Sequence, residues 1–325
     1  MAERDYSIDA LSGLMILGVL FVHTMSWSGL DNSLLYTIVE YCIFFRMPYF
    51  FYKSGVYYRQ VTDYQCIIGG GKLLRLFVKY SFIAYLVYCC ILFIKDDFSI
   101  TNVVKIPIKQ LLVNGTLNSN LPLWFLTTFF AAKVLYNWFR NKGVKNIVIL
   151  SIFAILTLSL FYFSQRPDWV SFPRYVYSIS GAVFFISVGN QLKSIQFNKW
   201  IIIFATIGYC VIAIFSHSRV DMFENELIEG RYEIWMLSSI LGIIILINLF
   251  KVLYNSYRFP FLSFINRNAL PLFASHWIIY LVVSNLFIEP LSIENSYYKI
   301  LIYATILLMY IGLLFFIEKR KNVTN

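Results

Sequence analysis

The sequence contains few charged residues. Only 14% of its 325 residues are Asp, Glu, Lys or Arg, whereas a soluble domain typically carries about 25%. Apolar residues make up 59% of the chain, and the mean hydropathy is +0.68. So few charges cannot cover the surface of a soluble core of this size. The composition therefore excludes an ordinary soluble domain and predicts an integral membrane protein.

Acidic residues and cysteine motifs are scarce as well. The chain has 17 acidic and 27 basic residues, a net charge of +10, with the basic residues scattered between apolar runs. Membrane topology explains that scatter better than nucleic-acid binding does. The five cysteines show no CxxC or Cys/His metal spacing, so we expect no metal site and interpret them as small apolar side chains: Cys42, Cys66, Cys89, Cys90 and Cys210.

Long apolar runs are abundant. A helix needs about 20 mostly apolar residues to cross a bilayer. Runs of this kind predict helices at 8–28, 36–57, 73–94, 121–139, 146–164, 175–192, 200–216, 232–250, 269–287 and 298–317. The predicted fold is an all-α integral membrane protein with about ten transmembrane helices, forming a single domain over residues 1–325. An even number of crossings puts both termini on one side.

Basic residues indicate which side that is. They are about twice as frequent on the face shared with the termini as on the other, which predicts that both termini are cytoplasmic. The inner set is Arg4, Arg59, Lys72, Arg75, Lys79, Arg140, Lys142, Lys145, Lys193, Lys199, Lys251, Arg258, Arg267, Lys319, Arg320 and Lys321. The outer loops carry most of the acidic residues. The longest of them, about 95–120, is expected to hold a short helix.

His23 lies inside the first apolar run, SGLMILGVLFVHTMSW. An ionisable residue at that depth normally faces a cavity, a partner or a substrate. Glu40 is predicted at a similar depth on the second helix, where its carboxylate would fix the imidazole tautomer, as a general base needs. The alternative is that Glu40 faces the outer aqueous surface and never meets His23.

Cations follow along the second and third predicted helices. Arg46 and Lys53 lie in apolar surroundings, and Lys72 and Arg75 are three residues apart, so they share one helical face. Together they could hold a polyanion, such as a nucleotide phosphate arriving from the cytosol. Ordinary positive-inside anchoring is the alternative for Lys72, and snorkelling is the alternative for Lys53.

Two further features carry less information. His276, in NALPLFASHWIIY, is a second histidine inside a span, and such a residue is more often a helix–helix hydrogen-bonding group than a catalyst. The run Gly69 to Gly71 is too short for a phosphate-binding loop and is interpreted as a flexible start to the third helix. His217 is given no role.

Five segments of the chain resemble one known family. IDALSGLMILGVLFVH resembles a first-helix pattern of an aspartate, an arginine–glycine pair and, ten residues further on, a histidine. FFRMPYFFYKSG is similar to an MP-x-FF-x-x-SG signature, and KLLRLFVKY to a basic segment of the third helix. PLWFLTTFF and RNALPLFASH resemble later helices. In this order the segments resemble the acyltransferase-3 family of integral membrane acyltransferases over nearly the whole chain.

The chain departs from the family pattern at three places. Ser12 stands where the family has its first-helix arginine, so Arg46 or Lys53 would have to supply that charge. A pair of arginines in the third helix appears as Lys72 and Arg75, which keeps the charge but loses one bidentate fork. Lys79 stands where the family often has proline.

The resemblance implies a membrane O-acyltransferase. It would move an acetyl group from the cytosolic co-substrate acetyl-CoA, or a similar acyl group from a longer donor such as succinyl-CoA, to a hydroxyl of an extracytoplasmic polysaccharide or lipid-linked sugar. His23 and Glu40 would be catalytic, and Arg46, Lys53, Lys72 and Arg75 would bind CoA. The protein would lie in the inner or plasma membrane and act alone or with a separate periplasmic or synthase partner. The alternatives are a transporter or flippase of a glycan or lipid intermediate, and a non-catalytic partner of a polysaccharide synthase.

Overall fold

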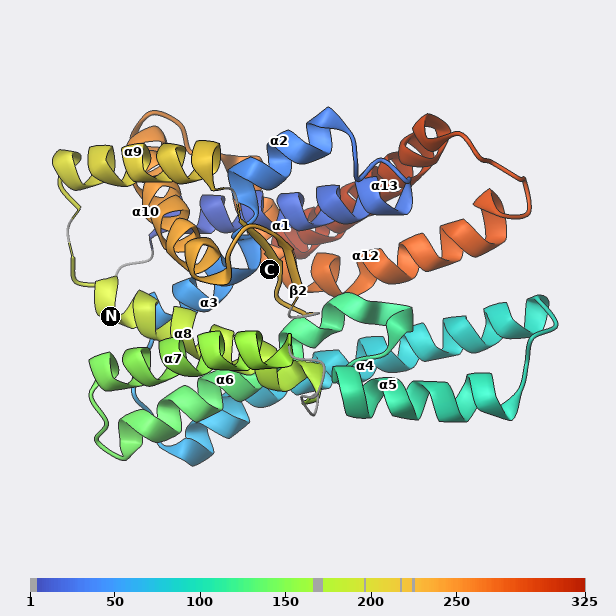
Figure 1. The fold of residues 1–325 in the computed structure, drawn as a ribbon. Helices are drawn as coiled ribbons and strands as arrows, with labels where there is room; N and C mark the ends of the chain where they lie inside the picture. Colours follow the sequence, from blue (N-terminus) through green and yellow to red (C-terminus); the bar gives the residue numbers. More distant parts are fainter. Residues whose placement is uncertain (1–4, 166–171, 196, 217, 224–225, 325) are drawn as a thin grey trace. The chain divides into compact units, whose positions relative to one another are not determined.

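A computed structural model shows a chain built almost wholly of helices (Figure 1). It describes residues 5–324 except 166–171, 196, 217 and 224–225. Arg4 and His217, named in the sequence analysis, therefore lie outside the described residues. So do Arg166, Asp168 and Glu224, which belong to the predicted outer loops. The predicted all-α class is confirmed.

Helices occupy all ten of the ranges predicted from apolar runs. They are α1 (Tyr6–Trp27), α2 (Leu34–Ile43) with α3 (Arg46–Val56), α4 (Asp63–Ile94), α6 (Trp124–Asn141), α7 (Asn146–Ser164), α8 (Arg174–Leu192), α9 (Lys199–Phe215), α10 (Tyr232–Ser256), α12 (Ala269–Val283) and α13 (Ser296–Thr324). Shorter pieces are the π-helices η1 (Thr101–Lys105) and η3 (Ser284–Ile288), α5 (Ile106–Asn114), the 3₁₀ helix η2 (Asn118–Leu123) and α11 (Pro260–Arg267).

Seven helical segments in the described part of the chain are long and apolar enough to cross a membrane. The protein is thus a multi-pass membrane protein. Of the other predicted spans, α9 has 17 residues and is apolar but short, whereas α6 and α8 carry more polar residues. α8 packs against α3, α6 and α7, and its buried face includes Ser178, Ser180 and Ser187. A helix enclosed by protein does not need an apolar surface towards lipid, so a search by hydropathy alone can miss such a span. The count of ten crossings and the side of the termini stay predictions.

The second predicted span is not one helix. It breaks at Phe44–Phe45 into α2 and α3. Pro48 accounts for the break, because proline has no N–H to bond the carbonyl four residues earlier and its ring crowds that carbonyl. Arg46 consequently begins a helix instead of lying in the middle of one.

The third predicted span begins ten residues earlier than expected. α4 starts at Asp63, and Gly69 to Gly71 lie inside it, so the interpretation of these glycines as a flexible segment is wrong. A capping box starts the helix: Gln65 N–H donates to Thr62 Oγ1 and Thr62 N–H donates to Gln65 Oε1, both at 3.2 Å. Gly70 lies against the Phe130 ring, where a Cβ atom would come within 2.5 Å.

The long loop at 95–120 contains the expected short helix, in the form of η1 and α5. A feature that the sequence did not predict lies between α9 and α10, where β1 (Arg219–Asp221) pairs antiparallel with β2 (Glu226–Glu229). Val220 faces Leu227 in this register, and Asp221 faces Glu226.

The chain divides into two compact units. Unit 1 comprises residues 1–43, 83–98 and 249–325, and unit 2 comprises residues 44–82 and 99–248. Within unit 1, α1 meets α11 so closely that a Cβ on Gly13 would come within 2.1 Å of the Leu262 carbonyl oxygen. The single-domain prediction over 1–325 stays a prediction.

Glycines also set the closest helix crossing of unit 2. A Cβ on Gly55 of α3 would come within 1.9 Å of the Ile186 carbonyl oxygen, and one on Gly189 of α8 within 2.0 Å of the Tyr52 carbonyl oxygen. Small residues allow helix backbones to approach in this way inside a membrane. α6, α7 and α8 lie side by side in the same unit (Figure 1).

Candidate functional site

His23 is held between two consecutive residues of α12. Its ring stacks on the ring of His276, with centroids 5.2 Å apart and planes 27° from parallel. The Trp277 indole meets the same imidazole edge-on, at 5.2 Å and 89°. His23 is half-buried, and its two aromatic partners restrict the orientation of its ring.

His276 is the fully buried member of this pair, with 0% of its surface exposed. Its Nδ1 lies 3.1 Å from the Leu272 carbonyl oxygen. A carbonyl only accepts, so the hydrogen-bond network assigns the ring hydrogen to Nδ1 and leaves Nε2 as an acceptor in the neutral ring. Nε2 is buried and has no hydrogen-bond partner among the described residues.

A hydrogen bond beside His23 locks α1 to α12. The hydroxyls of Thr24 and Tyr280 lie 2.7 Å apart, and the Tyr280 ring is edge-on to His276 at 5.7 Å. Trp27, one turn beyond His23, meets Trp277 at 5.2 Å and Tyr303 at 6.2 Å. These rings form a wall of aromatic side chains around the histidine pair.

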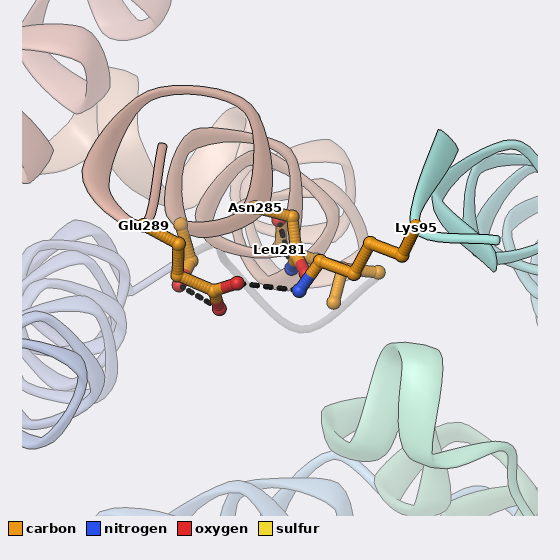
Figure 2. Close-up of polar contacts among 5 residues, drawn as sticks. Lys95, Leu281, Asn285 and Glu289 are labelled. Carbon is orange, nitrogen blue, oxygen red and sulfur yellow. Dashed lines mark hydrogen bonds and ion pairs between the residues drawn. The ribbon is translucent and has the colours of Figure 1, made fainter. Parts of the chain in front are cut away.

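An ion pair lies at the ends of two unit 1 helices. Figure 2 shows the Lys95 side chain, just beyond α4, reaching the Glu289 carboxylate just after η3. Both side chains are substantially exposed, at 42% and 50%. In the same turn Asn285 Nδ2 donates to the Leu281 carbonyl at 2.8 Å. The pair ties the C-terminal end of α4 to the last turn of the α12–η3 segment.

Glu40 and Ser12 occupy buried positions in unit 1. Glu40 is only 6% exposed, on α2, which packs against α1; its pairing with His23 stays a prediction. Ser12 is completely buried, and its hydroxyl donates to the Ile8 carbonyl at 2.7 Å. The Ser12 hydroxyl is thus satisfied within its own helix.

The four predicted CoA-binding cations all belong to unit 2. Arg46 and Lys53 are half-buried at the two ends of α3, whereas Lys72 and Arg75 are exposed on α4. The Gly55–Gly189 crossing holds α3 against α8. His23 and Glu40 belong to unit 1, so the sequence-predicted residues divide by chemistry between the units.

A hydrogen-bonded clamp anchors the start of α4. Asp63 Oδ1 accepts from Asn137 Nδ2 at 3.0 Å and from Asn141 Nδ2 at 2.7 Å. The Val61 carbonyl accepts from the same two amides. Tyr58 donates its hydroxyl to Asn137 Oδ1 at 3.0 Å, and burial raises the pKa of Tyr58 to about 12. The clamp joins α4 to α6 and so fixes the helix that carries Lys72 and Arg75.

Sequence reasoning did not place His276 beside His23. The signal that could have found it is an ionisable residue inside a second span, which is a candidate functional residue by default. Taken together with His23, it pointed to two imidazoles inside the membrane-spanning region. The stacking itself depends on how α1 and α12 pack, which no local pattern records.

These features define a multi-pass, all-helical membrane protein with a histidine pair inside its spans. The chain belongs to the acyltransferase-3 family: the family model described as "acyltransferase domain" matches residues 5–317. The resemblance seen in the sequence is thus confirmed, and the protein is a membrane acyltransferase. No curated protein matches the chain, and no solved structure matches it either.

Residues of the family motifs make identifiable helix contacts in this fold. In MPYFFYKSG, Pro48 breaks the span, Phe51 is buried against Phe125 with ring centroids 5.2 Å apart, and Gly55 makes the crossing with α8. In the first-helix motif, Asp9 accepts a hydrogen bond from Asn266 Nδ2 at 3.0 Å, which holds α1 to α11. The motifs mark helix contacts as well as the histidine.

Proposed function

We propose that this protein transfers an acetyl group from cytosolic acetyl-CoA to a hydroxyl of an extracytoplasmic polysaccharide or lipid-linked sugar. Family membership over residues 5–317 supports acyl transfer. The observation that carries the assignment to a residue is the half-buried His23 ring, held in one orientation by His276 and Trp277. An imidazole fixed and partly accessible is what a general base requires.

In the proposed reaction His23 takes the proton of the acceptor hydroxyl as its oxygen bonds to the acetyl carbonyl carbon. The tetrahedral intermediate then expels the CoA sulfur, which recovers that proton from His23. The products are an acetyl ester and free CoA thiol, and the imidazole returns to its starting state. Alternatively, His23 carries the acetyl group itself for one step, which would give a burst of labelled protein before product forms.

Lys72 and Arg75 are proposed to bind the phosphates of CoA. They are exposed and share one face of α4, and guanidinium and ammonium groups hold phosphates by charge-assisted hydrogen bonds. Arg46 is proposed to assist them, because it starts α3, where the helix dipole adds positive potential. Glu40 is proposed to support the His23 imidazole. The proposed location is the inner or plasma membrane, with both termini cytoplasmic.

Radiolabel transfer tests the function. Membrane vesicles that contain the protein and its native surface glycan are given [1-¹⁴C]acetyl-CoA, and label in carbohydrate is counted. His23→Ala is expected to lower transfer by roughly 100-fold or more, the usual contribution of a general base, at unchanged protein level. Glu40→Gln is expected to lower it less, since it removes only a supporting group.

Two outcomes would contradict the proposal. Full transfer by His23→Ala would remove that residue from the chemistry. Absence of label in carbohydrate with the wild-type protein, together with movement of unmodified glycan lipid across the vesicle membrane, would indicate a flippase instead. The break at Phe44–Phe45 within a membrane span is the type of feature that transporters also use.

A further inference from the structure

A histidine at position 276 would destabilise the fold if its only role were packing. The site is fully buried, and the rings of His23, Phe273 and Tyr280 lie around the imidazole. Nε2 has no hydrogen-bond partner among the described residues, and a buried acceptor without a donor destabilises the fold. Leu272, the partner of Nδ1, is four residues earlier in the same helix, so the bond to its carbonyl does not join helices. A phenylalanine would fill this space without that cost.

The geometry of the His276 ring indicates a role beside His23. His276 lies behind His23, since His276 is closed to solvent whereas His23 is partly open. The stacked planes are 27° from parallel and the centroids 5.2 Å apart, so His276 presents the face of its ring to the neighbouring imidazole. An electron-rich aromatic face attracts a cation above it.

We propose that His276 is a positioning residue that acts through His23. Its neutral ring fixes the orientation of the His23 imidazole and stabilises the positive charge that His23 gains when it accepts the hydroxyl proton. This inference rests on the acyl transfer proposed above, because His23 acquires the charge only during that reaction.

The effect belongs to the chemical step and not to donor binding. His276 is closed to solvent, and the predicted CoA-binding cations belong to the other unit. Its loss should therefore lower kcat and leave the KM for acetyl-CoA unchanged, because an interaction made only during the reaction affects the rate. A purely structural residue would instead lower the amount of folded protein in step with activity.

Three variants in the same vesicle assay distinguish a positioning role of His276 from a purely structural one. His276→Ala removes both ring and lone pair, and we expect kcat to fall about 10- to 100-fold with KM for acetyl-CoA within about twofold of wild type. His276→Phe keeps an aromatic face for stacking and should retain more of the wild-type kcat than the alanine variant does. Ser275→Ala is the matched control: the neighbouring side chain bonds Pro271 and Tyr310 and should leave kcat unchanged.

Wild-type kcat in His276→Ala would overturn the inference, and so would equal kcat for the alanine and phenylalanine variants. Both results leave the proposed function intact as long as the wild type transfers label. A measurement independent of turnover is labelling of the two imidazoles with diethylpyrocarbonate, located by mass spectrometry. His23 should react and His276 should be protected in the wild type. Equal labelling of both would contradict the buried position that the proposal needs.

Discussion

The two compact units of this protein hold their candidate functional residues in different ways. In unit 1 an imidazole is fixed by rings, with His23 between His276 and Trp277 and a wall of aromatic residues behind them. In unit 2 helices are brought into backbone contact at Gly55 and Gly189, and the predicted phosphate-binding cations project from α3 and α4. Stacking restricts a side chain, whereas close backbone packing positions whole helices. The residues proposed for the chemistry and those proposed for donor binding are thus held in place in different ways.

The largest effect outside His23 and His276 is expected at the unit 2 crossing. Gly189→Ala would put a Cβ within 2.0 Å of the Tyr52 carbonyl oxygen, which only movement of α8 away from α3 can relieve. Overpacking of this kind costs about 1–3 kcal/mol or more. We expect a lower melting temperature in detergent and less folded protein.

Gly69→Ala is the matched control for that variant. It lies in a helix of the same unit with nothing within 4 Å of the added Cβ. Replacing a mid-helix glycine by alanine stabilises by about 0.5–1 kcal/mol, so its melting temperature should rise slightly. If Gly189→Ala were equally harmless, the close α3–α8 approach would be wrong.

A smaller effect is expected at the donor-binding cations. Arg75→Ala removes a charged donor from the exposed face of α4, and a hydrogen bond to a charged group contributes about 1.5–3 kcal/mol. We expect the KM for acetyl-CoA to rise roughly tenfold while kcat stays near the wild-type value. Initial rates over a range of acetyl-CoA concentrations measure both.

Lys319→Ala provides the comparison for Arg75. Lys319 is exposed on α13 in unit 1 and belongs to the same positive-inside set, so it should leave the KM unchanged. An equal rise in KM for both variants would mean that donor binding depends on overall surface charge. The division of labour between the units would then fail.

The smallest effect is expected at the Lys95–Glu289 ion pair. Exposed pairs contribute about 0.2–1 kcal/mol and are screened by salt. Lys95→Ala should therefore lower the melting temperature slightly at low ionic strength and not at high ionic strength. Lys109→Ala, an exposed lysine on α5, is the control. A loss larger than that for Gly189→Ala would show that unit 1 depends on this pair more than its exposure allows.

Much of the fold could be predicted, because apolar runs of membrane-spanning length are local signals. Helix starts and breaks were also encoded but were missed. Thr62 and Gln65 form a capping box that starts α4 early, and Pro48 interrupts a run that composition alone presents as continuous. In both cases average hydropathy hid a specific backbone requirement.

The candidate site was only half visible in the sequence. His23 could be proposed from its depth in an apolar run and the cations from their spacing, and their roles stay predictions. The contact between His23 and His276 joins residues on α1 and α12, so it depends on helix rotation and tertiary packing. The α4 clamp at Asn137 was missed for the same reason: its partner Asp63 is distant in sequence, and neither residue belongs to an apolar pattern.

The length of α4 has a consequence for how a water-soluble donor meets a membrane enzyme. Its 32 residues form a rod roughly 48 Å long at 1.5 Å per residue, whereas the hydrocarbon layer is about 30 Å thick. Part of the rod must therefore extend beyond the lipid tails, or the rod must tilt steeply. The clamp at Asp63 fixes the end that carries Lys72 and Arg75. In the proposed topology these cations stand at headgroup level, where a nucleotide can be captured without leaving water.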